Sequence, residues 1–199
     1  MIKQDTLLDQ LSHLLSKLPG LGPRSARRIT LELIKKKHNL FLPLIQTMQD
    51  TAEQITTCEL CGNLDLQSPC QLCAEPKRDI QQICIVEDVI DLWAIERAHI
   101  FKGRYHVLGG TLSAIDGVGP EQLSVPKLLS RIESEKIEEV IFATSATLDG
   151  QTTSHYILEA LKPYQVKTSR IAYGVPMGGE LDYLDEGTLV TAFQSRSSL

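Results

Sequence analysis

The chain has 199 residues, of which 42% are hydrophobic and 23% charged, and its formal net charge is −5. A chain of this length can bury a substantial core, as one main domain or as two. It has no run of about eighteen apolar residues, and the first five residues do not resemble a secretory signal. We therefore expect a soluble cytoplasmic protein and exclude a membrane-spanning one.

Charge is distributed unevenly along the chain. Residues 1–53 contain eight Lys and Arg against five Asp and Glu, whereas residues 79–199 contain ten against seventeen. A basic amino-terminal part joined to an acidic remainder indicates that one end meets nucleic acid and the other meets a different partner. A solvated surface would also account for so modest an excess of charge.

The amino-terminal part indicates helices joined by a tight hairpin. Behind a cap at Thr6 or Asp5, a leucine stripe at helical spacing predicts a first helix with a core face, formed by Leu7, Leu11, Leu14, Leu15 and Leu18. Residues 18–23, Leu-Pro-Gly-Leu-Gly-Pro, exclude a helix and favour a hairpin with positive φ at the glycines. A second helix is expected from Ser25, and a further amphipathic helix over residues 39–55.

The hairpin and the start of the second helix have the chemistry of a phosphate site. Glycines let backbone N–H groups approach an anion closely, and a helix presents its positive end there. Arg24, Arg27 and Arg28 can close around the phosphate. Because no group here is placed to read a base, we expect salt-sensitive, sequence-independent DNA binding.

Cys58, Cys61, Cys70 and Cys73 form two C-x2-C pairs separated by eight residues. Four thiols so close in sequence can surround one Zn2+ ion tetrahedrally. The intervening loop supplies turn-forming residues for a compact knuckle, namely Gly62, Asn63, Ser68 and Pro69. Two disulfides, four unrelated cysteines and an iron–sulfur cluster are the alternatives. In a reducing cytosol, thiols paired in this way more often bind metal than oxidise, so we predict a structural zinc site.

Beyond residue 79, short apolar runs alternate with helical patterns. Strands are expected over residues 83–86, 105–108, 140–143 and 166–172, and helices over residues 89–98, 125–132, 154–161 and 189–193. This alternation predicts an α/β domain with a largely parallel sheet covered on both faces. Acidic residues follow the ends of three strands, where functional groups of such sheets gather, namely Glu87, Asp88, Asp116 and Asp149.

Cys84, His106 and the tyrosines of this part are expected to have structural roles. Cys84 lies within an apolar run and is expected to pack as a small hydrophobe. His106 is expected to be a satisfied histidine of a strand. The tyrosines, Tyr105 among them, are expected to pack with their hydroxyls at the surface.

Two regions carry a family resemblance. Residues 18–29, Leu-Pro-Gly-Leu-Gly-Pro-Arg-Ser-Ala-Arg-Arg-Ile, resemble the helix-hairpin-helix motif of the RecR recombination-mediator proteins, and the four-cysteine knuckle follows where that family has it. The acidic remainder resembles the Toprim domain of topoisomerases and primases in its RecR form, including Val86-Glu87-Asp88. The resemblance covers essentially the whole chain and implies DNA-binding cations at Arg24 and Arg28, with Arg27 beside them and Lys17 as a further candidate.

The same resemblance assigns a use to the acidic residues. In that family the acidic Toprim surface is implicated in docking the basic partner RecO, and the corresponding positions here are Glu87, Asp91 and Asp149. Electrostatic complementarity of this kind mainly sets the association rate and the choice of partner. Asp91 can equally be a solvated helix residue.

One departure from the Toprim pattern bears on catalysis. Catalytic Toprim domains place two aspartates one residue apart, whereas this chain has Asp149-Gly150-Gln151, where RecR relatives usually have Glu-Gly-Glu. A glutamine lacks the charge that a hard-cation site needs. The resemblance therefore implies a non-enzymatic mediator. The alternatives are a Mg2+-dependent nuclease or primase-like enzyme that uses Glu87, Asp116 and Asp149, and a zinc-stabilised scaffold that binds only protein.

The resemblance also implies an assembly. We expect a homodimer or homotetramer that clamps gapped DNA at the nucleoid and, with RecO and RecF, promotes recombinase loading. The expected parts are a helix-hairpin-helix module over 1–53, a zinc knuckle over 54–78, a Toprim-like α/β domain over 79–173, and a carboxyl-terminal segment with a helix over 174–199.

Overall fold

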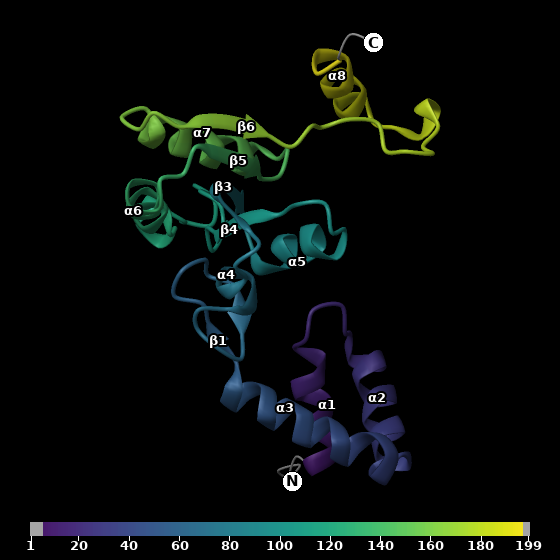
Figure 1. The fold of residues 1–199 in the computed structure, drawn as a ribbon. Coiled ribbons are helices and arrows are strands. Elements are labelled where there is room, and N and C mark those ends of the chain that lie inside the picture. The colour runs from purple at the N-terminus through teal and green to yellow at the C-terminus, as the bar shows by residue number, and fades with distance from the viewer. Residues whose placement is uncertain (1–5, 197–199) are drawn as a thin grey trace. The chain divides into compact units, whose positions relative to one another are not determined.

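The computed structural model describes residues 6–196. The chain divides into two compact units, and the boundary in the sequence lies between Ile55 and Thr56 (Figure 1). The first unit is helical, with α1 (Leu7–Ser16), α2 (Pro23–Lys35), the π-helical turn η1 (Lys37–Phe41) and α3 (Leu42–Gln54). The second unit contains the cysteine knuckle and the sheet. The finer division into four parts stays a prediction.

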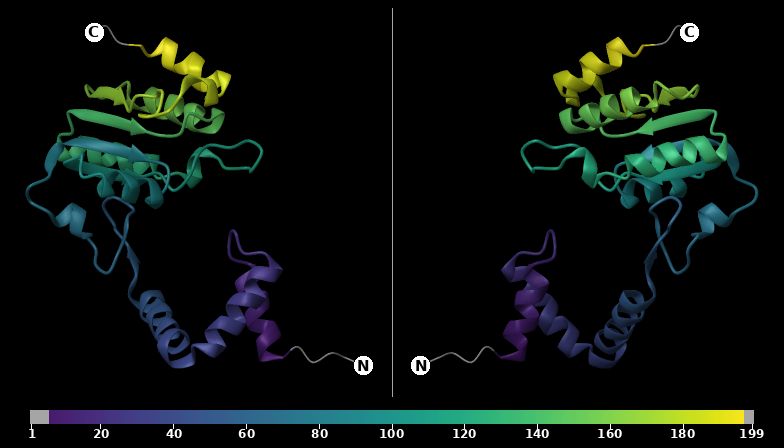
Figure 2. Two further views of the ribbon diagram at one scale, coloured as in Figure 1. Left: turned by 90° about the vertical axis from the view of Figure 1, so that its right-hand side faces the viewer. Right: turned by 90° about the vertical axis from the view of Figure 1, so that its left-hand side faces the viewer.

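The helix-hairpin-helix prediction is confirmed with shifted boundaries. Thr6 caps α1, because its hydroxyl accepts the N–H of Asp9 at 3.2 Å; Asp5 lies outside the described residues. α2 begins at Pro23 instead of Ser25, since proline at the first helical position has a suitable φ and no N–H to satisfy. Residues 39–41 belong to η1, so α3 begins at Leu42. Figure 2 shows α1 and α2 lying side by side below the hairpin loop.

The first unit buries few side chains. Ala26, Thr30 and Leu33 of α2 are buried, and the Thr30 hydroxyl lies 2.9 Å from that of Ser12 on α1. The prediction that the leucine stripe of α1 is core was wrong at Leu7, Leu14 and Leu18, which are 82%, 61% and 49% exposed. A helical unit this small has too few elements to cover the whole apolar face of a short helix.

The second unit opens with the knuckle and continues into a four-stranded sheet. The knuckle contains an antiparallel ribbon, β1 (Thr56–Thr57) with β2 (Leu64–Asp65), and the short helix α4 (Gln71–Ala74). The sheet strands are β3 (Asp79–Val86), β4 (Gly103–Val107), β5 (Glu139–Ala143) and β6 (Lys167–Arg170). They run in the order β4-β3-β5-β6 and every pairing is parallel, as the alternating pattern predicted.

Helices cover both faces of this sheet. They are α5 (Val89–Arg97), α6 (Val125–Glu135) and α7 (Leu148–Leu161), and α8 (Glu186–Gln194) follows in the carboxyl-terminal segment. Short 3-10 turns occupy Pro120–Gln122 and Leu181–Tyr183. α5 and α6 lie on opposite sides of the sheet (Figure 1).

The central strand β3 shows why the sheet is covered twice. Its side chains alternate between two cores, with Ile83 and Ile85 in the core that includes α6 and α7, and Cys84 and Val86 in the core that includes Leu92 of α5. Cys84 packs as a small hydrophobe, as predicted, and burial raises the pKa of its thiol to about 12.

α7 begins six residues before its predicted start. Thr147 caps it by accepting the N–H of Gly150 at 3.1 Å. A β-carbon on Gly150 would lie 2.5 Å from the carbonyl oxygen of Ser145 and 2.7 Å from Oε1 of Glu87. Glycine, which lowers helix propensity, is therefore required here by the close approach of the preceding loop and Glu87.

The structure confirms the prediction for one residue of β4 and contradicts it for its neighbour. His106 is a satisfied core histidine, as expected, because its Nε2 lies 2.9 Å from the Ser124 hydroxyl; burial lowers its pKa to about 4. The prediction of surface hydroxyls was wrong for Tyr105, whose hydroxyl is buried and lacks a hydrogen-bond partner among the described residues. Burial is the main cause that raises the pKa of Tyr105, and the nearby Glu96 carboxylate is the second.

Candidate functional site

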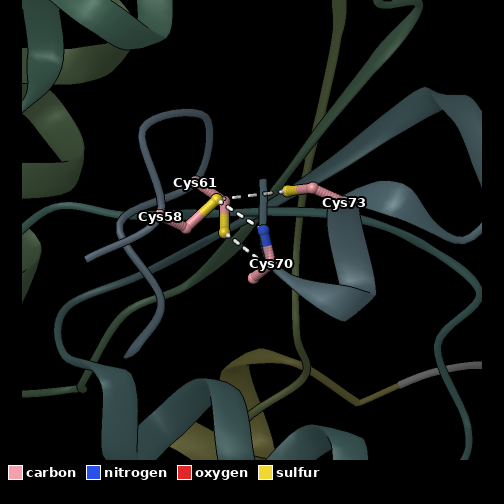
Figure 3. Close-up of side chains that lie close together, drawn as sticks. All are labelled: Cys58, Cys61, Cys70 and Cys73. Atoms are coloured by element: carbon pink, nitrogen blue, oxygen red, sulfur yellow. Dashed lines mark hydrogen bonds between the residues drawn. The ribbon is translucent and has the colours of Figure 1, made fainter. Parts of the chain in front are cut away.

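The four cysteines form a cluster that fits a tetrahedral metal ion (Figure 3). Their sulfur atoms all lie within 4.8 Å of one another, and the Cys61–Cys70 and Cys58–Cys73 pairs are 3.5 and 3.9 Å apart. Four thiolates at about 2.3 Å from a central ion would be separated by about 3.8 Å, between the two measured pair distances. Free thiols in this arrangement are placed to bind a metal ion.

Backbone groups support negative charge on these sulfur atoms. The N–H of Cys70 donates to Sγ of Cys58 at 3.3 Å, and the N–H of Asn63 donates to Sγ of Cys61 at 3.4 Å. Burial opposes ionisation of Cys58, but backbone N–H groups, that of Cys70 first, outweigh it and lower its pKa to about 7. Cys73 and burial instead raise the pKa of Cys61. Four adjacent thiols need a central cation before all can ionise, which is the function of a bound metal.

The knuckle is attached to the sheet by backbone and side-chain bonds. The N–H of Val107 at the end of β4 donates to the carbonyl of Cys61 at 2.8 Å. Gly62, with φ +81°, lies against Val107 so closely that a β-carbon there would be 3.1 Å from the valine's. Nε1 of Trp93 on α5 donates to Oδ1 of Asn63 at 3.1 Å. The cysteine cluster is therefore joined to both β4 and α5.

Arg78, between the knuckle and β3, makes a second connection. Its side chain is 7% exposed and donates to Glu96 at 2.6 Å, to the carbonyl of Gly103 at 2.8 Å and to Glu75 at 3.2 Å. Its guanidinium also lies over the ring of Tyr105, 5.7 Å from the centroid. One arginine thus connects the end of the knuckle, α5 and β4.

The cations predicted for DNA binding have a different environment. Lys17, Arg24, Arg27 and Arg28 are exposed, and none makes an ion pair or side-chain hydrogen bond within residues 6–196. The N-cap of α2 is Gly22, which has no side chain to accept the first free N–H groups of the helix. The prediction of positive φ at the hairpin glycines is confirmed at Gly20, with φ +77°, and was wrong at Gly22, where φ is −78° because this residue is the extended N-cap of α2. The hairpin therefore presents unpaired cations beside uncapped N–H groups, the arrangement that favours an anion.

The acidic residues lie at the carboxyl edge of the sheet, as predicted. Glu87 directly follows β3, and its Oε1 accepts the N–H of Ser145, beyond β5, at 2.7 Å. Asp116 accepts a hydrogen bond from Ser113 at 2.9 Å in the loop after β4. Asp149 lies in the first turn of α7.

The side chains near this edge of the sheet differ in the hydrogen bonds that they make. Asp91 is part of a capping box on α5, in which it accepts the N–H of Asp88 at 3.0 Å. Gln151 folds back to donate to the carbonyl of Ala146 at 3.0 Å. In the part of the chain that the structure describes, the four cysteines are the one group of three or more His, Cys, Asp or Glu side chains that lie close enough together to hold a metal ion. The acids at the sheet edge do not converge in this way.

Two residues of this region escaped the sequence analysis. Asn63 was identified only as a turn residue, although it contacts the sulfur of Cys61 and the indole of Trp93. Arg78 was not identified at all, because no pattern in the sequence pairs it with Glu96, eighteen residues later. The contacts of Asn63 with Trp93 and of Arg78 with Glu96 are both long-range and form only in the folded unit.

Within residues 6–196, no helix combines the length and the apolar composition needed to cross a membrane. Three family models match the chain. Residues 8–52 match the RecR helix-hairpin-helix, residues 81–172 the Toprim domain, and residues 174–197 the RecR carboxyl-terminal region.

Curated relatives match over almost the full length. Recombination protein RecR of Erythrobacter litoralis is 53% identical over 95% of this chain and 96% of its own. The proteins of the same name from a Bradyrhizobium species and from Parvibaculum lavamentivorans are both 55% identical, the first over 96% of each chain and the second over 95% of each. The chain belongs to the RecR family of recombination proteins.

Proposed function

We propose that this protein is a non-enzymatic recombination mediator that holds DNA through its hairpin. The observation that carries the proposal is the set of exposed, unpaired cations beside the uncapped start of α2. Backbone N–H groups and arginines recognise phosphates without reading bases, so binding would be sequence-independent and salt-sensitive. A protein with this role would work at the nucleoid in the cytoplasm.

Zinc is the metal we propose for the cysteine cluster. Four thiolates in a closed tetrahedral set are typical of structural zinc, and the sulfur distances fit it. When bound, the ion would supply positive charge that keeps the thiolates ionised. Cys58, Cys61, Cys70 and Cys73 would hold it, while Asn63 connects the site to α5 and Val107 connects it to β4.

A homodimer or homotetramer that clamps DNA would explain the apolar exposure of the first unit. Leu7 and Leu14 of α1 and Met48 of α3 are more than half exposed. Exposed apolar surface of this kind marks interaction sites. Several weak hairpins in one assembly would also raise avidity without new contacts.

Partner binding would use the acidic edge. Glu87, Asp91 and Asp149 are partly exposed carboxylates on or beside α5 and α7, and we propose that they dock RecO. RecF would cooperate in loading recombinase at gaps. Complementary charge of this kind speeds encounter with a basic partner and excludes acidic ones.

The first experiment incubates the zinc-loaded protein with gapped duplex DNA and Mg2+ at low salt. The same sample is then run on native and denaturing gels. The proposal expects retarded but uncut DNA, and a variant carrying Arg24→Glu and Arg28→Glu should lose the retardation. Lys162→Glu, an exposed change on the second unit, is the matched charge control.

Cleaved or extended DNA would replace the mediator by a Mg2+-dependent enzyme. Retardation that survives both arginine reversals would show that the hairpin is not the DNA site. No retardation by the unaltered protein would leave a protein-binding scaffold.

A further inference from the structure

α5 carries an apolar surface that the rest of the second unit does not cover. Leu92 is fully buried against the sheet, whereas Ile90 and Trp93 are 68% and 51% exposed. Positions three apart are neighbours on a helix, so these two side chains form one continuous patch. We call Ile90 and Trp93 the α5 patch.

The indole of Trp93 is held in place by a hydrogen bond to the cysteine knuckle. Its Nε1 donates to Oδ1 of Asn63 at 3.1 Å. Asn63 is 5% exposed; its own N–H donates to Sγ of Cys61, and its carbonyl accepts the N–H of Cys58 at 2.7 Å. The polar group of the indole is therefore already satisfied, and the exposed remainder is apolar and held in one orientation.

Negative charge lies beside the patch. Glu87 and Asp88 immediately precede α5, and Asp91 lies between the two patch residues in sequence. In the cap of α5, both Asp88 and Asp91 accept backbone N–H groups. At the opposite end of the helix, Arg97 is exposed.

We propose that the α5 patch is the apolar anchor of the partner-docking surface, and that its occupant is a protein segment with an apolar side chain next to basic ones. This inference rests on the proposed docking of a basic partner at Glu87, Asp91 and Asp149. Tryptophan is enriched among the few residues that dominate binding energy, and a fixed aromatic ring loses little entropy on binding.

Charge decides between this occupant and two others. Nucleic acid would bring phosphates against the carboxylates at the start of α5, which opposes binding. A second copy would bring the same acidic turn against a self-complementary interface, unless Arg97 of that copy paired with it. A basic protein segment satisfies the apolar and the acidic parts together.

The test measures affinity for RecO by calorimetry with full-length, zinc-loaded variants. Ile90→Lys changes a residue that is 68% exposed, and Trp93→Ala removes the indole. Ile115→Lys, at a 97% exposed position in the loop after β4, is the matched control. Because the chain has a single tryptophan, labelling with 5-fluorotryptophan gives one 19F resonance that reports on the patch directly.

We expect Ile90→Lys and Trp93→Ala each to weaken RecO binding by about tenfold or more, with no effect of Ile115→Lys and a shifted 19F resonance in the complex. If Asp149→Lys abolishes binding while both patch variants bind normally, the acidic docking surface stands and the anchor is refuted. If neither kind of change matters, both proposals fail.

Two further results would overturn the anchor in favour of another occupant. Dissociation of the oligomer by Ile90→Lys, seen by light scattering, would make the patch an interface between copies. A 19F shift on adding single-stranded DNA without RecO would make it a nucleic-acid surface.

Discussion

The buried contacts of Arg78 allow a quantitative prediction about what joins the knuckle to the sheet. Arg78→Met keeps the aliphatic volume and removes the bonds to Glu96, Glu75 and the carbonyl of Gly103. Glu96, 22% exposed, would then be a carboxylate without its cation. Breaking a buried pair by removing one partner costs about 3–5 kcal/mol, because the remaining charge is uncompensated.

The assay is urea unfolding followed by the fluorescence of Trp93. This residue lies on α5, the helix that also carries Glu96, so its signal reports on the correct unit. With an m-value of about 2 kcal/mol/M, the midpoint of Arg78→Met should fall by about 1.5–2.5 M. Lys162→Met, which breaks an exposed pair with Glu159, should leave the midpoint almost unchanged.

A double variant separates the ion pair from simple packing. Glu96→Gln in the Arg78→Met background removes the uncompensated charge, so the double variant should be more stable than the sum of the single effects predicts, by about 1–3 kcal/mol. Strict additivity, or a cost of under about 1 kcal/mol for Arg78→Met alone, would refute the idea that this pair connects the knuckle to the sheet.

Two more predictions concern the metal and a buried histidine. Removing zinc with a chelator, or replacing Cys58 by Ser, should lower the unfolding midpoint of the second unit before DNA retardation is lost; a metal-free Cys58 variant of unchanged stability would contradict this. The folded pKa of His106 is about 4 against about 6.5 unfolded, so the unfolded state binds more protons between these values. Stability from this residue should be complete above pH 6.5 and fall by about 3 kcal/mol towards pH 4, and His106→Gln should flatten that part of the pH profile in urea titrations.

Local patterns predicted the elements of this protein better than their ends. Alternation in Ile83-Cys84-Ile85-Val86 indicates a buried strand because both of its faces are apolar, and the structure places them in two cores. The start of α7 was missed because Gly150 lowers helix propensity, a cost that is offset by contacts with Ser145 and Glu87 from elsewhere in the fold. Helix propensity depends on local sequence alone, so it does not include contacts with residues from elsewhere in the fold.

The candidate sites also differ in how well the sequence predicts them. The cysteine cluster was predictable because its ligands are close in sequence, so spacing alone constrains their geometry. The grouping of the hairpin cations followed for a similar reason, and their role in DNA binding stays a prediction. Asn63 and Arg78 were not, because each derives its role from residues that only the folded sheet brings near.

The acids at the sheet edge also differ in what a charge reversal would test. Reversing Glu87 removes its bond to the Ser145 N–H as well as its charge, and reversing Asp91 breaks the cap of α5. Loss of partner binding in either variant could therefore come from a displaced loop or a frayed helix. The Asp149 carboxylate makes no hydrogen bond or ion pair within residues 6–196, so Asp149→Lys changes charge with the least change in structure. Binding lost in that variant, with an unchanged unfolding midpoint, would identify electrostatic docking; binding retained there but lost in Glu87→Lys would instead point to the loop that Glu87 holds.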